Sequence, residues 1–275
     1  AVSRLGGKPG YVCRVGDDEF GMSFLEMWKK EGVDTSHVIV EKNGFTAAYF
    51  ISLKNGGEHD FTYIRRGSAA SHLSPKDIDS GYIKSAKVVH TSGITQAISE
   101  DCRAASMKAV SSAKEFGVKV SYDPNIRLKL WPSSEAAKRV VAETMLSADI
   151  FLPTAEEATM LTGTSDPAEQ AEKLLSSVSD VVAIKMGAKG CYVAKSNGEN
   201  LMLGGFRVKV VDTTVAGDAF DGAVIVGYLE GWSIEEIGEF ANGAGAITTT
   251  GRGAVKPIPT RRQVERLTAR LRHRK

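Results

Sequence analysis

Residues 212–220 read D-T-T-V-A-G-D-A-F and carry the clearest chemical signal in the sequence. They join an apolar run, 206–211, to a run of helical character, 219–230, so we expect a strand that leads through small residues into a helix. The first turn of such a helix has unpaired N–H groups and the positive end of the helix dipole, and it binds anions. Asp218 adds a carboxylate there. A base beside a phosphate-binding turn predicts proton removal from a hydroxyl during phosphoryl transfer, as in a small-molecule kinase.

A simpler interpretation of this stretch also exists. An acidic residue in a first helical turn often only complements the helix dipole, and small residues before a helix are ordinary connectors. The full string is more specific than its G-D step, because a one-sided apolar face follows it. That face comprises Phe220, Ala223, Val224, Gly227 and Tyr228. We therefore interpret Asp218 as catalytic.

The composition indicates which kinds of ligand this protein binds. The 275 residues carry a net charge of +2 with a quarter of them charged, which argues against a nucleic-acid or membrane-binding body and favours a small metabolite. The basic end, 261–275, has Val264, Leu267 and Leu271 at helical spacing, so we predict a solvated helix there rather than a nucleic-acid tail.

Neither disulfides nor zinc ligands are predicted. Cys13, Cys102 and Cys191 are far apart, and the five histidines are scattered without ligand spacing. The apolar runs are shorter than a bilayer span, and no signal-peptide pattern opens the chain. We expect a cytoplasmic protein.

From about residue 88 onward, β-like runs alternate with helical patterns. Predicted strands are 87–91, 118–122, 150–153, 181–185 and 190–194, and predicted helices lie near 100–116, 134–146, 155–161 and 167–176. This alternation is typical of an α/β fold with a mostly parallel sheet covered on both faces. Asp123, Thr154 and the 212–218 turn should then meet beyond the carboxyl ends of the strands.

Residues 38–67 interrupt this rhythm. Predicted antiparallel strands at 38–41, 46–53 and 59–65, with a loop at 55–57, form a small β lid. A lid suits a kinase because it keeps water from the phosphoryl group, whereas the alternative is an extra sheet that only completes the core. We predict an α/β catalytic domain of 1–37 and 68–275 with the lid inserted at 38–67. Residues 1–7 resemble a helix end before a strand at 11–14, and we expect a further N-terminal strand to precede this sequence.

Several motifs together point to a family. They read R-L-G-G-K-P-G-Y-V-C-R-V-G-D-D-E-F-G at 4–21, G-S-A-A-S-H-L-S-P at 67–75, D-P-N-I-R-L-K-L-W at 123–131, L-P-T-A-E-E-A at 152–158 and K-M-G-A-K-G at 185–190. With the 212–220 string, they make nearly the whole sequence similar to the ribokinase/PfkB carbohydrate kinases, and within them to the 2-keto-3-deoxygluconate kinases. The resemblance implies a ribokinase-like fold with a central, mostly parallel sheet, flanking helices and a small antiparallel β lid.

The resemblance also implies roles for residues around ATP and Mg²⁺. Asp218 would be the base, and the amides of Ala216, Gly217 and Asp218 would form the anion hole. The residues expected to contact the nucleotide are Lys185, Gly187, Gly190, Val215, Ala216, Gly217, Asn242 and Gly245. Glu157 would organise magnesium through water, and the sequence leaves open whether a potassium-like cation binds beside Asp212.

The substrate side follows from the same resemblance. Tyr49, Tyr63 and Arg65 on the lid, with Asn125 and Arg127 after a core strand, match substrate-binding positions. Two arginines favour a carboxylate ligand, hence a sugar acid, unless they are ordinary surface or ion-pairing arginines. We predict an ATP-dependent kinase that converts 2-keto-3-deoxygluconate to 2-keto-3-deoxy-6-phosphogluconate. The alternatives are a neutral-sugar kinase of the fructokinase or ribokinase type and a weakened sugar-binding member of the family.

Two residues depart from the family pattern. Val215 stands where relatives have glycine, and its backbone would be strained at positive φ. We expect this strain to reduce turnover without abolishing it. Thr154 replaces an asparagine, which puts magnesium affinity in question.

By resemblance we also expect a homo-oligomer assembled through the lid. The expected small-molecule partners are a sugar acid and ATP, and neither nucleic acid nor membrane is an expected partner.

Overall fold

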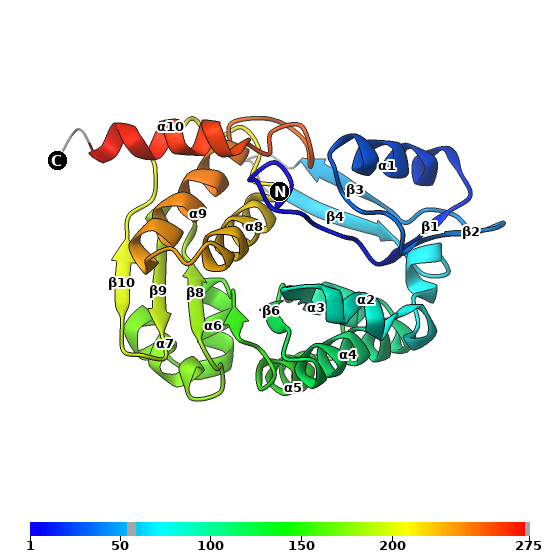
Figure 1. Cartoon of the computed structure of the whole chain (residues 1–275), viewed down its shortest axis with the longest axis horizontal. Helices are drawn as coiled ribbons and strands as arrows, with labels where there is room; N and C mark the ends of the chain where they lie inside the picture. Colours follow the sequence, from blue (N-terminus) through cyan, green and yellow to red (C-terminus); the bar gives the residue numbers. More distant parts are fainter. Residues whose placement is uncertain (54–58, 273–275) are drawn as a thin grey trace.

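The computed structural model describes residues 1–53 and 59–272, and its centre is a six-stranded sheet (Figure 1). The strands of the chain are β1 (Cys13–Gly16), β2 (Val38–Glu41), β3 (Ala48–Leu53), β4 (His59–Ile64), β5 (Val88–Ser92), β6 (Lys119–Asp123), β7 (Ile150–Phe151), β8 (Val181–Lys185), β9 (Cys191–Lys195) and β10 (Asn200–Leu203). The order in the central sheet is β10-β9-β8-β7-β6-β5. Pairing is parallel from β5 to β8 and antiparallel from β8 to β10. The predicted α/β class and the five strands predicted between residues 87 and 194 are confirmed.

Helices cover both faces of this sheet (Figure 1). They are α1 (Glu19–Lys30), α2 (Ser80–Ser85), α3 (Gly93–Ile98), α4 (Glu100–Glu115), α5 (Ser134–Met145), α6 (Ala155–Thr162), α7 (Pro167–Leu175), α8 (Ala216–Leu229), α9 (Ile234–Thr248) and α10 (Arg261–Arg272), with 3₁₀ turns at Ala69–His72, Pro75–Asp77, Leu128–Leu130 and Gly187–Lys189. α8 and α9 pack on one face, where α10 lies against α9, and α4 to α7 pack on the other. The helix predicted at the basic C-terminal end is confirmed as far as residue 272.

The core explains how strand β8 presents its side chains. Val181 and Ala183 belong to the apolar cluster under α8 and α9, whereas Val182 and Ile184 belong to the cluster on the opposite face. Side chains alternate along a strand, so the next residue, Lys185, faces α8. The register of β8 thus directs Lys185 toward α8, the helix whose first turn is formed by residues 216–218.

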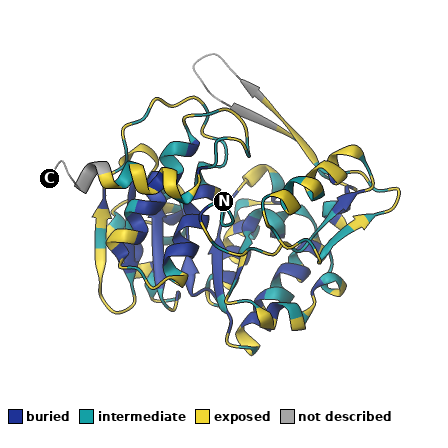
Figure 2. Ribbon diagram, turned by 45° about the horizontal axis from the view of Figure 1, so that its top comes forward, coloured by how far each residue is buried: buried dark blue, intermediate teal, exposed yellow. Residues whose placement is uncertain are grey.

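Two smaller sheets lie outside the central one. β3 and β4 form the antiparallel lid, which projects from the body of the molecule (Figure 2). β2 pairs in parallel with β1, so the prediction that residues 38–41 form an antiparallel lid strand is wrong. The cause lies in the connection: α1 joins β1 to β2, and a helical crossover favours parallel pairing. The predicted loop at 55–57 lies outside the described residues.

Two further expectations are corrected. Residues 206–211 form no strand: β10 ends at Leu203, and the N–H groups of Val211 and Asp212 donate to the Thr249 carbonyl at the end of α9. Val211 is half exposed. This apolar run pairs with no strand among the described residues, so it stays at the surface. The first residues of the chain form hydrogen-bonded turns instead of a helix end, and Leu5 fills a place in the core under α8.

None of the described helices is long and apolar enough to cross a membrane. Cys13, Cys102 and Cys191 are free thiols in this structure.

Candidate active site

The 216–218 turn opens α8 in the conformation that an anion site requires. Ala216 donates its N–H to the Thr213 carbonyl at 3.3 Å, but within the described residues the N–H groups of Gly217 and Asp218 donate to no other group. The Asp218 side chain is exposed. Two N–H groups without an acceptor among the described residues and an accessible carboxylate therefore share one helical turn. The amide of Ala216 is already in use, and the predicted anion hole stays a prediction.

Val215 precedes this turn in the left-handed region, with φ 56° and ψ 13°. The prediction of a strained backbone at this position is confirmed, because a β-branched residue is unfavourable at positive φ. The segment before it is fixed by Asp212, whose carboxylate accepts the N–H of Thr214 at 2.9 Å and that of Gly253 at 3.0 Å. Asp212 thus ties the turn to the 250–258 loop, and its predicted role as a cation ligand stays a prediction.

The lid brings its aromatic residues and one arginine together. The rings of Tyr49 and Tyr63 lie 6.3 Å apart, and the Arg65 guanidinium carbon lies 5.6 Å from the Tyr63 ring centroid. Burial, and after it the charge of Asp218, raises the pKa of Tyr49, so Asp218 lies within electrostatic reach of the lid. Arg65 Nε is buried and has no hydrogen-bond partner among the described residues. A ligand bound beside Arg65 would find an unused donor.

The loop after β6 carries the other two predicted substrate residues. Asn125 has a positive φ of 34°, and its N–H donates to Asp123 Oδ1 at 3.0 Å. Arg127 is exposed. The structure therefore places both residues at the carboxyl end of the sheet, but Arg127 projects to solvent rather than into a buried pocket.

Glu157 holds that loop in place. Its carboxylate accepts the N–H of Ile126 at 2.6 Å and the N–H of Thr154 at 2.8 Å, and the Thr154 hydroxyl accepts the N–H of Glu157 in return. This capping box begins α6. A carboxylate has about four lone-pair sites, so Glu157 retains capacity for a water molecule beside these two bonds.

The predicted nucleotide loop follows β8. Gly187 and Gly190 have φ of 59° and 101°, and a Cβ on Gly190 would lie 2.0 Å from the Leu203 carbonyl oxygen. Only glycine fits there. Lys185, by contrast, is buried and pairs with two carboxylates beneath the turn.

The remaining predicted nucleotide residues lie on α9. Gly245 faces the start of α8, where a Cβ would lie in ordinary contact, 3.4 Å from the Ala216 carbonyl oxygen. Asn242 is buried, and its amide donates to the carbonyl oxygens of Leu203 and Gly204 at 3.4 and 3.3 Å. α9 therefore braces the turn and the 203–204 loop, and the proposed adenine contacts stay predictions.

Four residues around the turn did not enter the predicted site. Asp123 was expected near the turn but was assigned no function. Asp221, Tyr11 and His90 were not predicted as site residues. Asp221 left a signal in the sequence, because an acid between Phe220 and Gly222 on an apolar helix needs a buried partner. Tyr11 and His90 left none. Tyr11 and His90 are both exposed, and the charge of Asp218 favours the protonated form of each.

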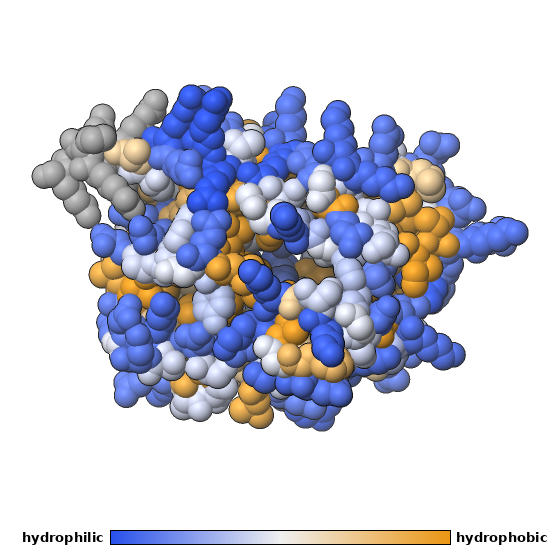
Figure 3. All heavy atoms as spheres, viewed as in Figure 1, coloured by the Kyte–Doolittle hydropathy of each residue, from blue (hydrophilic) through white to orange (hydrophobic). Residues whose placement is uncertain are grey.

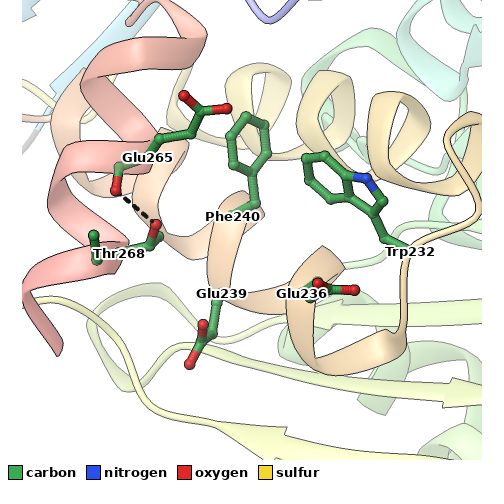
Figure 4. A pocket seen from close by; sticks show the side chains of 7 residues that line it. Trp232, Glu236, Glu239, Phe240, Glu265 and Thr268 are labelled. Atoms are coloured by element: carbon green, nitrogen blue, oxygen red, sulfur yellow. Dashed lines mark hydrogen bonds between the residues drawn. The ribbon is translucent and has the colours of Figure 1, made fainter. Parts of the chain in front are cut away.

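A separate pocket of about 260 Å³ lies between α9 and α10 (Figure 4). Trp232, Phe240 and three glutamates line it, and it shares no residue with the predicted site. Near the middle of the molecule, the face shown in Figure 3 is hollowed, and this place lies between the lid and α3 in Figure 1.

Among the described residues, no group of three or more histidine, cysteine or acidic side chains could hold a metal ion by itself. Magnesium at phosphates keeps several waters and needs few protein ligands, so Glu157 acting through water fits such an ion.

An α/β sheet whose carboxyl edge carries a helix start with two available N–H groups and an accessible carboxylate is the arrangement expected of a phosphotransferase. The family model described as pfkB family carbohydrate kinase matches residues 1–261. The chain therefore belongs to the pfkB family of carbohydrate kinases, which confirms the predicted family and enzyme class.

Three relatives illustrate the similarity. Fructokinase-2 of Solanum lycopersicum is 40% identical over 270 residues, which are 94% of this chain and 81% of the relative. A fructokinase from Vibrio cholerae O395, crystallised with fructose, ADP and calcium, aligns with a TM-score of 0.85 at 29% identity and covers 97% of this chain and 87% of its own. A candidate ribokinase II from E. coli, in complex with ATP and Mg²⁺, aligns at 0.89 with 27% identity over 98% and 85% of the two chains.

Proposed function

We propose that this protein is an ATP-dependent kinase of a neutral sugar, with fructose as the first candidate, acting on a terminal hydroxyl. The observation that carries the proposal is the exposed Asp218 carboxylate beside the free amides of Gly217 and Asp218. The names of the curated relatives favour the neutral-sugar alternative over the sugar acid that the sequence analysis preferred. Fold alone does not set the substrate, so the choice of sugar needs a direct test.

The proposed reaction follows from this geometry. Asp218 accepts the proton of the sugar hydroxyl as its oxygen forms a bond to the γ-phosphorus of ATP. The bond from that phosphorus to the bridging oxygen breaks, which leaves ADP and a sugar phosphate. The N–H groups of Gly217 and Asp218 donate to the oxygens of the transferred group, where negative charge accumulates. Asp218 then releases its proton to water.

Binding of the nucleotide and its ions would use the neighbouring loops. Gly187 in the 187–190 turn has open space where a Cβ would lie, which permits close approach of ATP, whereas Gly190 packs against the Leu203 carbonyl oxygen. Magnesium, when bound, would neutralise charge on the phosphates, with Glu157 oriented to accept from one of its waters. Asp212 retains the role of a proposed ligand for a potassium-like cation.

A second candidate substrate is 2-keto-3-deoxygluconate, because Arg65 Nε is buried without a partner among the described residues. A carboxylate would satisfy that donor through a charge-assisted hydrogen bond. A sugar hydroxyl would satisfy it too, although with less free energy.

A coupled assay of ADP formation would separate these candidates. We expect kcat/KM for fructose to exceed that for ribose and for 2-keto-3-deoxygluconate by about tenfold or more, a typical effect of one or two well-placed contacts. A preference for the sugar acid would establish the second candidate. Calorimetric binding of a sugar without any ADP formation would instead support a weakened sugar-binding protein and overturn the kinase proposal.

The lid is the proposed site of self-association. Phe50, Ile51 and Ile64 are exposed on β3 and β4, and these strands pair only with each other in the described part of the chain. Exposed apolar strands of this kind suit a second copy of the same sheet. Light scattering after gel filtration should show a dimer, and Phe50→Asp should shift it toward the monomer.

A further inference from the structure

A buried group of three ionisable side chains lies directly behind the 216–218 turn. Lys185 Nζ is 3.2 Å from Asp123 Oδ2 and 3.1 Å from Asp221 Oδ1. All three side chains are less than one-tenth exposed, at 9%, 5% and 4%. We call Asp123, Lys185 and Asp221 the buried triad.

Strand alternation and helix periodicity explain why these residues meet. Lys185 ends β8 on the α8 side of the sheet, and Asp123 ends β6 on the side opposite to Tyr122, which belongs to the other cluster. Asp221 follows Asp218 by three residues on α8, so the two acids lie nearly one above the other. Lys185 and Asp123 are thus fixed in the sheet, whereas Asp221 belongs to the helix that carries the proposed base, Asp218.

The charges of the triad balance only if one carboxyl keeps its proton. Two carboxylates and one ammonium would leave a net negative charge in a dry site, at a high desolvation cost. Burial and the neighbouring Asp123 raise the pKa of Asp221 well above its ordinary value. Burial opposes ionisation of Asp123 as well, but Lys185 leads the contacts that hold its pKa below the ordinary value. The balanced form is a protonated Asp221, an ionised Asp123 and a charged Lys185.

Other charged groups face the triad from the elements around it, and they do not change this balance. Glu157 on α6 favours the charged form of Lys185, His90 on β5 favours the charged form of Asp123, and Asp218 disfavours ionisation of Asp221.

The ammonium of the triad lies against the backbone of the turn. A Cβ placed on Gly217 would be 3.8 Å from Lys185 Nζ, and Gly217 provides one of the two free N–H groups. A fixed positive charge behind these donors raises the potential where an anion would bind. A side chain at Gly217 would contact this ammonium.

We propose that the buried triad positions the 216–218 turn for phosphoryl transfer, with Lys185 supplying part of the positive potential that the transferred group meets. Lys185 is then a positioning residue behind the turn rather than a direct contact of the nucleotide. The inference rests on the proposed kinase function and deepens it. The competing explanation is an ion cluster that only stabilises the fold.

The chain offers a matched control for this distinction. Lys119 at the other end of β6 pairs at 3.0 Å with Asp149, whose side chain is only 6% exposed. Lys119→Met therefore removes a lysine from a buried aspartate in the same sheet, at the edge opposite the turn. It should lower thermal stability and leave kcat within about twofold, since the lost interaction is remote from the reacting groups.

The test compares Lys185→Met, Asp221→Leu and Lys119→Met by kcat, sugar KM, ADP affinity and melting temperature. We expect Lys185→Met to lower kcat by roughly 10- to 100-fold, less than the loss of a direct oxyanion donor, with sugar KM and ADP affinity within about threefold of wild type. Asp221→Leu keeps the Lys185–Asp123 pair balanced, so it should fold, and it should lower kcat about tenfold because the link from Lys185 to α8 is lost.

The outcomes separate the two proposals. If wild type turns over no sugar, the proposed function fails. If wild type is active and folded Lys185→Met keeps kcat within threefold, the triad proposal is overturned. It is also overturned if sugar KM and ADP affinity weaken as much as kcat falls, which is the pattern of general disruption. If Lys185→Met does not fold, Asp221→Leu serves as the test instead. A kcat of Asp221→Leu within threefold of wild type then rejects the proposal.

Discussion

The 216–218 turn and the lid support their functional side chains in different ways. The turn rests on α8, on the sheet ends and on the buried triad, all inside the core. The lid strands pair with each other, and residues such as Phe50 and Ile64 remain exposed. Two-stranded ribbons are marginally stable alone, so the lid depends on contacts at its base. We therefore propose that the core-supported turn carries the chemistry and that the lid sets the choice of substrate.

Asp218→Asn gives the strongest test of this division. It should lower kcat by roughly 10²- to 10⁴-fold because it removes the proton acceptor, with little change in melting temperature since the side chain is exposed. A coupled ADP assay and thermal unfolding measure both. Asp101→Asn, an exposed acid in the first turn of α4, is the matched control and should leave turnover intact. Undiminished turnover in Asp218→Asn would remove the basis of the proposed mechanism.

Arg65→Met tests the lid side of the comparison. We expect kcat/KM for the sugar to fall by about 10- to 100-fold, mainly through KM, because the variant loses a buried charged donor. The loss should be greater for 2-keto-3-deoxygluconate than for fructose. Arg66→Met changes the exposed neighbour and should stay within twofold of wild type. A fall in kcat at constant KM would show that the lid takes part in the chemical step.

Asp18→Ala probes the base of the lid. Asp18 accepts the N–H of Gly21 at the start of α1, and it accepts both the N–H and the hydroxyl of Thr46 just before β3. The variant should lose about 1–2 kcal/mol of stability and raise sugar KM several-fold with kcat nearly constant. Asp17→Ala, at an exposed neighbour, is the control.

The same contact gives a pH prediction. The backbone N–H groups of Thr46 and Gly21 lower the pKa of Asp18, so the native state favours its ionised form. Its stabilisation is present above the ordinary carboxyl pKa of about 4 and is lost as pH falls through the lower folded value. Urea unfolding between pH 7 and pH 3 should therefore show a smaller acid loss in Asp18→Ala. An identical pH dependence in both proteins would argue against this anchor.

Val215→Gly should have the smallest effect. The change relieves a strain of order 1–3 kcal/mol at positive φ, partly offset by the greater freedom of glycine in the unfolded chain. We expect a gain of about 1 kcal/mol in stability and a several-fold rise in kcat, measured by denaturation and the coupled assay. Asn43→Gly changes another positive-φ residue, on the turn after β2, and should leave kcat unchanged. Unchanged kinetics in Val215→Gly would show that the strain does not limit the turn.

Local patterns predicted much of the fold and the centre of the site. The β8 strand, the α/β alternation and the position of Asp218 were all visible in short stretches of sequence, because period and turn chemistry are local properties. The strand that pairs with β2 could not be predicted in this way. The same four-residue apolar run can pair with an antiparallel or a parallel neighbour. The strand expected at 206–211 failed for a similar reason: the apolar run has no neighbouring strand to pair with.

The sequence by itself determined the family, the helix-start turn that carries Asp218 and the strained place of Val215, because each depends on residues that are adjacent in the chain. Only the tertiary structure decided that Lys185 meets Asp123 and Asp221 in the core and that Glu157 holds the loop after β6. It also decided that Arg65 Nε is buried without a hydrogen-bond partner among the described residues. The physical reason is that the ionisation and hydrogen bonding of a buried group depend on neighbours distant in sequence. Those neighbours are fixed only when sheet register and helix packing are complete.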